Sequence, residues 1–558
     1  MSPSATPHGT PGSAAAPSSR PAWREAAAIV LAFIALAVLF TYPLAFHLTS
    51  LTYQINNGDS KFSLWIVGWV AHALTSNPLG VLHANIFFPE RFTLAYSESN
   101  LGTGLLAAPV YWLTGSVYAA HGFVLILSFV LTGVSTYYLV RYVVADRRAA
   151  FISGVAFAFT PFLFGHLSHI HLLMTAGLPL SLLAFHRLAD RPSAGRGAAL
   201  GAAMAFQALT CGYYAVFEVL LIGYATLFTA LSRRLWTSTR YWRAIGAAAL
   251  VALLVTAPLL LPVFALQRDT GFARPVEEGR LYAASWREYL ASGALAHRWG
   301  LSLVGRWTDL LFPGFISLFF GIAGVVVGWM TGGRRRELTA LYVSIGVLSL
   351  WISFGPAASL YSWLHATVPG FNFLRVPSRF GLLVMLALAV LAGVSLARLF
   401  EKMRRPALPA LALAIFGIAE LYRPIPYSTV PAPNPAHRIL ATLPRAGYVE
   451  LPLYSQRFAF VRADYMLNST THWMPLVNGF SDYTPKTFLD AADVLGQFPT
   501  RESLRHLVRD GVRYAVFHTD RYGQGRDALV ARLQEFAPHL RRLYGDDKTW
   551  LYEIVSTP

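Results

Sequence analysis

The stretch AAAIVLAFIALAVLFTYPLAFHL, residues 26–48, opens the apolar part of the chain and decides its class. It follows Arg20 and Arg24 and contains no charged side chain. A helix of this length crosses the hydrocarbon core of a bilayer. It is longer than the apolar part of a secretory signal peptide, and further apolar runs follow it. We therefore predict an uncleaved first membrane span.

Ten further apolar runs follow along the 558-residue chain. They cover residues 119–141, 149–165, 171–188, 197–211, 213–231, 244–266, 310–330, 338–354, 380–398 and 407–423. The chain is 55% hydrophobic and 13% charged, whereas a soluble domain is about 25% charged. This composition excludes an ordinary soluble enzyme, and 14% aromatic residues exclude a disordered chain. We predict a polytopic α-helical membrane protein with about 11 transmembrane helices.

The basic residues predict how the chain crosses the membrane. The net charge is +17, and arginines cluster at the edges of the apolar runs, within residues 141–148, 187–196, 233–243, 334–336 and 398–405. Cytoplasmic loops are enriched in Lys and Arg, so we expect these loops and the N-terminus in the cytoplasm. The same placement excludes a nucleic-acid-binding patch. The outer side then receives residues 49–118, 165–171, 267–309 and everything after residue 423.

Three domains follow from this topology. Residues 1–24, rich in Pro, Ser, Ala and Gly, form a disordered cytoplasmic tail, and residues 25–423 form the transmembrane domain. Residues 424–558 form an extracytoplasmic α/β domain with expected strands at 448–453, 512–518 and 550–555 and expected helices at 502–510 and 527–536. In the first outer loop, residues 62–74 and 101–113 are expected to be interfacial helices, with Trp65 and Trp69 at headgroup depth.

A carboxylate follows the first span, in the sequence NNGDSK at residues 56–61. Asp59 stands where the helix over 62–74 begins, so it is a good helix N-cap. A carboxylate between a membrane face and a helix start is equally suited to act as a general base on a hydroxyl group, or as a metal ligand. Lys61 lies beside it as a substrate-binding candidate.

The order of these features resembles the GT-C superfamily of integral membrane glycosyltransferases. The likeness lies in Gly58-Asp59, in Asn85-Ile86-Phe87-Phe88-Pro89, and in residues 101–115 followed by the span 119–141 with Arg141. The superfamily includes the protein O-mannosyltransferase, aminoarabinose transferase and oligosaccharyltransferase groups, and the architecture covers roughly residues 25–425. The chain departs from the usual Asp-Glu pair, because Ser60 follows Asp59.

The resemblance implies an inverting transfer of a sugar from a polyprenyl phosphate or pyrophosphate carrier to an extracytoplasmic acceptor. The chain has only four lysines among its 45 basic residues, which suggests a GC-rich genome and hence the inner membrane of a bacterium. Asp59 is the expected general base, and Glu98 in the same loop is the second candidate. Phosphate leaves without a general acid, whereas a hydrolytic glycosidase needs two facing carboxylates, and no such pair is evident.

Arginines suit the leaving phosphate, because the guanidinium fork matches phosphate geometry. Arg375 and Arg379, in the sequence RVPSR, precede the span 380–398 on the expected outer side. They are either ordinary flanking arginines or the phosphate clamp, and the outer side favours the clamp. Tyr213 and Tyr214, at an outer turn, either line the cavity or are ordinary interfacial aromatics.

Three histidines, His166, His169 and His171, fall in the second outer loop. This loop resembles the corresponding loop of the oligosaccharyltransferase group, which holds metal ligands. Imidazole suits a divalent transition metal. The same imidazoles could instead hydrogen-bond the donor phosphate or the acceptor, or simply lie at the interface.

Two other function classes stay open at this point. A transporter or lipid flippase would place polar groups at mid-membrane, where only Glu218 lies. A catalytically inactive scaffold of the same fold would act through the C-terminal domain. There, residues 472–473 and 478–483 form an aromatic and polar cluster that could bind an acceptor or form a surface turn.

Overall fold

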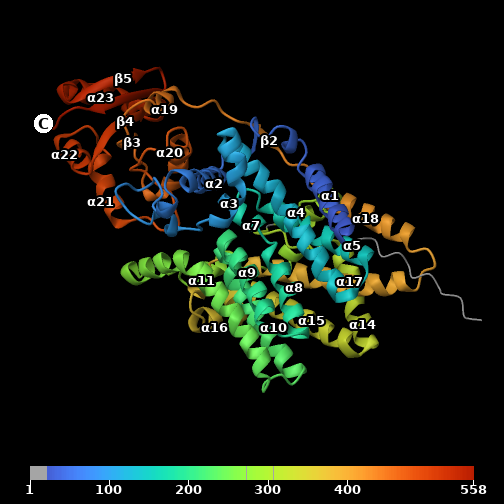
Figure 1. The fold of residues 1–558 in the computed structure, drawn as a ribbon. Coiled ribbons are helices and arrows are strands. Elements are labelled where there is room, and N and C mark those ends of the chain that lie inside the picture. Colours follow the sequence, from blue (N-terminus) through green and yellow to red (C-terminus); the bar gives the residue numbers. More distant parts are fainter. Residues whose placement is uncertain (1–21, 272, 306) are drawn as a thin grey trace, which may run out of the picture.

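The computed structural model describes residues 22–271, 273–305 and 307–558 (Figure 1). Most of the expected tail, residues 1–21, lies outside the described residues, and the first helix begins at Ala22. Each of the eleven expected apolar runs overlaps helix, although residues 310–314 of one run are not helical and lead into a π-helical turn, Ile316–Phe320. The helices are α1 (Ala22–Phe40), α4 (Val117–Val144), α5 (Arg147–Ala158) with α6 (Pro161–Gly165), α7 (Ile170–Leu173) with α8 (Gly177–Asp190), α9 (Ala194–Thr210), α10 (Gly212–Ser232), α11 (Thr239–Thr270), α14 (Gly321–Thr331), α15 (Gly333–Ser353), α17 (Gly381–Glu401) and α18 (Ala407–Leu421).

Seven stretches of helix in the described residues are long and apolar enough to cross a membrane. They are residues 23–40, 117–144, 147–165, 170–190, 212–232, 239–270 and 377–401. The remaining runs form shorter or less apolar helices. The coarse fold class is therefore confirmed: the chain is mostly helical, with several apolar helices and a small C-terminal sheet.

Local capping explains where several of these helices begin and end. α4 ends at Ala145 in the left-handed conformation, and Asp146 then caps α5 by accepting hydrogen bonds from the backbone N–H groups of Arg148 and Ala149. Ser193 caps α9 and Ser238 caps α11 in the same way. These side chains satisfy backbone donors that a helix leaves unpaired, so the turns between spans stay short.

Small residues allow close contact between neighbouring helices. α9 crosses α11 so closely that a Cβ on Gly197 would lie 2.2 Å from the carbonyl oxygen of Ala244. A Cβ on Gly201, one turn later, would lie 2.3 Å from that of Ala248. Helix pairs in membranes approach in this way because lipid supplies no hydrophobic drive to bring them together.

Three of the five expected basic loops meet at one end of the helices. Arg233, after α10, binds Asp190 at the end of α8 (Nη1–Oδ1 2.9 Å) and Glu337 at the start of α15 (Nε–Oε1 2.7 Å). Arg334 also binds Asp190 (Nη2–Oδ2 2.5 Å). Three loops that the charge pattern places on the same side are thus joined by ion pairs.

The first outer loop contains β1 (Leu51–Tyr53), α2 (Gly58–Ser76) and α3 (Leu101–Thr114). β1 pairs antiparallel with β2 (Tyr427–Thr429), with Leu51 opposite Thr429. The segment after the last span therefore returns to the segment after the first. This return strand lies in the proline-rich stretch 424–435, between the last span and the C-terminal sheet.

The expectation that Trp65 and Trp69 lie at a membrane interface is wrong. Trp65 is 1% exposed and donates from Nε1 to Asn85 Oδ1 at 3.1 Å, and Trp69 is 7% exposed. α20 (Arg462–Ser469) packs on α2, and the ring of Trp473 lies 5.8 Å from that of Trp69. A distant segment thus covers α2. α3, in contrast, keeps Trp112 and other large apolar side chains exposed.

The C-terminal domain is built on a four-stranded sheet with the order β3-β4-β6-β5. β3 (Gly447–Leu451) and β4 (Val512–His518) are parallel, and β6 (Thr549–Ile554) is antiparallel to β4 and to β5 (Leu540–Gly545). Its helices are α19 (Pro435–Leu440), α20, α21 (Lys486–Leu495), α22 (Arg501–Arg509) and α23 (Arg526–Glu535). Figure 1 shows this domain in orange and red at one end of the molecule, beside α2 and α3.

The remaining described helices are short and lie between the long ones. They are α12 (Glu278–Leu281), α13 (Arg298–Val304) and α16 (Leu360–Thr367), together with 3-10 turns. One such turn, Pro377–Phe380, leads directly into α17 and carries Arg379.

Candidate functional site

Asp59 lies in the first turn of α2, but it does not cap that helix. Asn57 is the cap: its Oδ1 accepts the backbone N–H of Asp59 at 2.8 Å. The Asp59 carboxylate is therefore free to face elsewhere, and its Oδ2 lies 3.4 Å from His169 Nε2. The side chain is 47% exposed, so a substrate hydroxyl can reach it.

Positive charge surrounds this carboxylate. The hydrogen bond to His169 holds the pKa of Asp59 below its ordinary value, and the charges of Arg375 and Arg379 act in the same direction. Partial burial opposes them without reversing the shift. Asp59 and the two arginines, which are separated by more than 300 residues, thus belong to one electrostatic environment, in which Asp59 is ionised.

The segment with the two arginines is held by Tyr213, at the start of α10. The Tyr213 hydroxyl donates to the carbonyl oxygen of Val376 (3.1 Å) and accepts from the backbone N–H of Val376 (2.7 Å). The Arg379 guanidinium lies 4.5 Å from the centre of the Tyr213 ring. Ser378 donates to Asp309 Oδ2 at 2.9 Å, so the turn between the arginines is fixed on two sides.

Arg379 retains unused hydrogen-bonding capacity. Its Nε is buried and has no hydrogen-bond partner in the described part of the chain. A buried donor without a partner costs free energy, and a bound anion would satisfy it. Arg375 is 40% exposed, and its Nη2 lies 3.7 Å from Asp482 Oδ1 in the C-terminal domain.

The three histidines lie in a row, with ring centres 6.2 Å apart for His166 and His169 and 5.8 Å apart for His169 and His171. Their ring nitrogens do not point to one common position. His169 faces Asp59, whereas His166 bonds through Nδ1 to the carbonyl oxygen of Phe162 (2.9 Å) and has Nε2 4.0 Å from Asp309. Burial lowers the pKa of His166, so its ring is neutral.

Glu98 has a different environment from Asp59. Its two carboxylate oxygens accept the backbone N–H groups of Gly212 (2.9 Å) and Tyr213 (2.8 Å), so it caps α10. Burial raises its pKa despite these two hydrogen bonds. Both oxygens are occupied, which makes Glu98 a structural cap in this geometry and leaves Asp59 the more accessible carboxylate.

Two other candidates are engaged in contacts with groups other than the two arginines. Lys61 forms an ion pair with Asp464 of the C-terminal domain, and Asp464 also binds Arg521 at 2.7 Å. The Tyr214 hydroxyl donates to the carbonyl oxygen of Leu172 at 3.0 Å inside the core. Their substrate-binding roles remain predictions.

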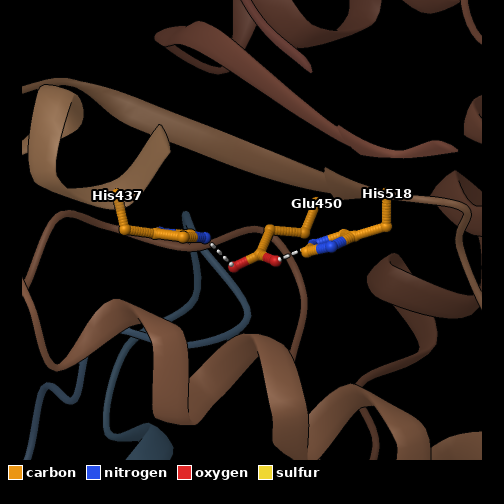
Figure 2. Close-up of side chains that lie close together, drawn as sticks. All are labelled: His437, Glu450 and His518. Atoms are coloured by element: carbon orange, nitrogen blue, oxygen red, sulfur yellow. Dashed lines mark hydrogen bonds and ion pairs between the residues drawn. The ribbon is translucent and has the colours of Figure 1, made fainter. Parts of the chain in front are cut away.

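A separate group in the C-terminal domain has the composition of a metal site. His437, Glu450 and His518 are buried, and one ligand atom of each lies within 4.8 Å of the others (Figure 2). It is the one such set of three His, Cys, Asp or Glu side chains within residues 22–271, 273–305 and 307–558. The expected set of His166, His169 and His171 does not form one.

Hydrogen bonds around this buried group determine which ring nitrogen of His472 and of His437 carries the proton. The backbone N–H of Met474 donates to His472 Nδ1 (3.0 Å), so neutral His472 carries its proton on Nε2 and donates it to His437 Nδ1 (3.1 Å). His437 then carries its own proton on Nε2, which faces Glu450 Oε1 at 3.6 Å. A metal needs a free electron pair on that nitrogen, which this arrangement of protons does not supply. The 3.6 Å contact is longer than a hydrogen bond, whereas His518 Nε2 lies 2.6 Å from Glu450 Oε2.

Comparisons with known proteins identify the fold. No protein-family model matches the chain, and no curated protein matches its sequence. Among solved structures, the arabinofuranosyltransferase AftD from Mycobacteria matches 97% of the chain with a TM-score of 0.60 and 15% identity. The protein has a GT-C fold. The chain spans 40% of AftD, so it corresponds to less than half of that protein.

Two further structures give lower scores. A mutant of AftD matches 97% of the chain with a TM-score of 0.56 and 15% identity, over 42% of that protein. ArnT from Cupriavidus metallidurans in the apo state matches 95% of the chain at 15% identity, over 98% of ArnT, with a TM-score of 0.48. At 15% identity, the similarity to AftD establishes a shared fold alone.

Within the GT-C fold, the structure adds acidic residues that the sequence did not single out by role. Asp309 is buried beside Ser378, and it directly precedes an apolar run, where no local signal marks it. Asp482 belongs to the polar cluster 478–483 and reaches Arg375. Trp473 of the other cluster packs on α2 and donates from Nε1 to Tyr111 at 2.9 Å, so it is part of a domain contact.

Proposed function

We propose that the protein is a membrane glycosyltransferase that transfers a sugar from a polyprenyl-phosphate-type donor to an acceptor, with inversion at the anomeric carbon. One observation carries the proposal: the Asp59 carboxylate shares its electrostatic environment with Arg375 and Arg379. The GT-C fold shared with AftD, an arabinofuranosyltransferase, supports the same reaction class.

The chemistry needs one base and one anion-binding group. Asp59 accepts the proton of an acceptor hydroxyl while the hydroxyl oxygen attacks the anomeric carbon. The bond between that carbon and the phosphate oxygen breaks, and its electron pair leaves with the phosphate. Arg379 and Arg375 stabilise the charge that grows on the phosphate. A low pKa keeps Asp59 ionised as a base, and phosphate needs no protonation to leave.

The location follows from the charge pattern. We place the basic loops and the N-terminus in the cytoplasm, and Asp59, Tyr213 and the arginines on the outer side. Tyr213 begins α10 and Arg233 follows its end, so the site and the basic loops lie at opposite ends of one helix. All eleven apolar runs then cross the bilayer of the bacterial inner membrane, and the C-terminal domain is extracytoplasmic.

A divalent metal stays a prediction in this scheme. The superfamily resemblance implied one near His166, His169 and His171, but two of these rings face different carboxylates, Asp59 and Asp309. The residues present therefore do not form a converged ligand set. The reaction above is written with protein groups alone.

The test compares Asp59→Asn with the wild type in nanodiscs, after mass spectrometry of the copurifying lipids has identified the carrier. We expect Asp59→Asn to lose about 10²–10⁴-fold in consumption of the lipid-linked sugar, because a general base contributes about that much. Asp269→Asn is the control, since Asp269 is exposed and pairs with its neighbour Arg268. Unchanged consumption in Asp59→Asn would reject Asp59 as the base.

The same assay separates the other function classes. A transporter or flippase would move the lipid-linked sugar without releasing free polyprenyl phosphate. An inactive scaffold would give equal, background release in the wild type and in Asp59→Asn. Release by the wild type and loss in the variant is the result that supports a transferase.

A further inference from the structure

Asp482 brings a carboxylate from the C-terminal domain into the arginine cluster. Its Oδ2 accepts the Ser97 hydroxyl at 2.8 Å, and its Oδ1 accepts Arg274 Nη2 at 2.8 Å. The same Oδ1 lies 3.7 Å from Arg375 Nη2. The next residue is also fixed, because the backbone N–H of Tyr483 donates to the carbonyl oxygen of Tyr96 at 3.0 Å. The carboxylate is therefore held in place by the first outer loop.

This contact changes how much positive charge the site can offer. Arg274 is 14% exposed and is shared between Asp482 and Glu278, whose Oε1 lies 3.7 Å from Arg274 Nη1. Arg375 also faces Asp482. Arg379, in contrast, stacks on Tyr213 and keeps an unpartnered Nε within the described residues. Of these three guanidinium groups, Arg274 and Arg375 both face the Asp482 carboxylate, whereas Arg379 forms no ion pair with a carboxylate of the described residues.

The charge on the donor must match this arrangement. A sugar on a monophosphate carrier is a phosphodiester with a single negative charge, whereas a pyrophosphate carrier has a second charged phosphate. The second phosphate needs a second available cation, because an unpaired charge at a partly buried site is costly. With Asp482 in place, Arg274 is engaged at 2.8 Å and the charge of Arg375 is partly offset at 3.7 Å. Arg375 can then help Arg379 with one phosphate, but no cation is left for a second phosphate, which the carboxylate would also repel.

We propose that Asp482 is a specificity-determining residue that restricts this site to carriers with one phosphate. The proposal rests on the proposed function and narrows its donor class. Arg379, helped by Arg375, holds the phosphate that leaves, and Asp482 offsets the positive charge that a second phosphate would require. The C-terminal domain therefore takes part in donor selection through a single side chain.

The test measures binding of undecaprenyl phosphate and undecaprenyl pyrophosphate to the full-length protein in nanodiscs. These free carriers are used because the sugar is not identified. We expect the wild type to bind undecaprenyl phosphate at least about ten-fold tighter, which is a difference of one decade in Kd. This direction is informative, because the more highly charged lipid would otherwise bind a basic site more tightly.

Asp482→Asn keeps the side-chain shape and removes the charge. We expect it to gain affinity for the pyrophosphate, so that the ten-fold preference shrinks or reverses. Asp490→Asn is the matched control, because Asp490 is an exposed carboxylate on α21 of the same domain. It should keep the wild-type preference.

The outcomes separate the two proposals. Preference of the wild type for the pyrophosphate, or an unchanged ratio in a folded Asp482→Asn, overturns the role of Asp482 while the transferase proposal stands. If Asp482→Asn does not fold, the wild-type ratio alone decides. Binding of neither lipid by the wild type contradicts the donor class itself and so removes the proposed function with it.

Discussion

Arg233 and Arg379 lie at opposite ends of α10 and have opposite kinds of neighbours. Arg233 binds two carboxylates, those of Asp190 and Glu337, at 2.9 and 2.7 Å. Arg379 lies over the ring of Tyr213 and has an Nε without a hydrogen-bond partner in the described residues. α10 has 21 residues, so about 30 Å separates the two ends.

The difference teaches how one residue type serves two purposes. A guanidinium between two carboxylates is neutralised, so it joins loops and has little charge left for a ligand. An aromatic ring supports a guanidinium without consuming its hydrogen-bond donors. The positive-inside pattern explains arginines of the first kind, and the second kind needs another explanation, for which we propose phosphate binding.

The sharpest test of this contrast is the loss of Arg379. We expect Arg379→Ala to reduce turnover of the lipid-linked donor by about 10²–10³-fold, which is typical for removal of one preorganised charge-stabilising group. Arg379→Lys should recover only part of this loss, because Lys lacks the fork. The measurement is steady-state release of polyprenyl phosphate.

Arg334 provides the control for that experiment. It also lies next to a span, but it binds Asp190 in the basic loops. Arg334→Ala should keep wild-type turnover per folded molecule. Equal losses in both variants would show that the two ends do not differ as described.

A second test concerns stability at the basic end. Arg233→Ala leaves Glu337 without its arginine partner and removes one of the two that bind Asp190. Breaking such a partly buried pair should cost about 3 kcal/mol, so we expect a lower melting temperature with unchanged kcat. Thermal unfolding in detergent measures the first quantity. A fall in kcat without a fall in melting temperature contradicts the assignment.

A third, smaller effect is expected at Tyr213. Tyr213→Phe keeps the ring beneath Arg379 but removes both hydrogen bonds to Val376. We expect KM for the donor to rise several-fold with a smaller change in kcat, because the arginine segment is less well held while its charge remains. Tyr213→Ala should be worse than Tyr213→Phe. If the two variants are equal, the ring does not support Arg379.

Sequence alone could predict the helices but not their partners. Each apolar run overlaps helix, and the strand expected at 512–518 has those bounds as β4. Charge pattern and hydropathy are local properties of the sequence, so they can be recognised without a structure. Asp59 and the two arginines were found because residue type and position in the loops were unusual.

What the sequence could not give depends on contacts between distant segments. Trp65 has the pattern of an interfacial residue, but α20 and Trp473 cover its helix. Asp309 and Asp482 are ordinary carboxylates until the fold places them beside the arginine segment. The N-cap of α2 is Asn57, two residues before the position that helix-start rules suggested, because helix boundaries are the least certain part of such predictions.

The smallest expected effect is on the pH profile, and it asks whether the arginine charge reaches Asp59. The pKa of Asp59 is held low by the hydrogen bond to His169 and by the charges of Arg375 and Arg379. A depressed pKa means that the ionised base is present at neutral pH and is lost only as pH falls through the lowered value. The acid limb of kcat/KM should therefore lie below the ordinary Asp value, about 3.9.

Arg375→Gln should move that limb to higher pH, because one stabilising charge is gone. Arg334→Ala, at the other end of the bundle, should leave it in place, since about 30 Å of separation exceeds the screening length several-fold. If the limb moves equally in both variants, the pKa of Asp59 depends on the net charge of the protein. That result would contradict a short-range interaction between Asp59 and Arg375.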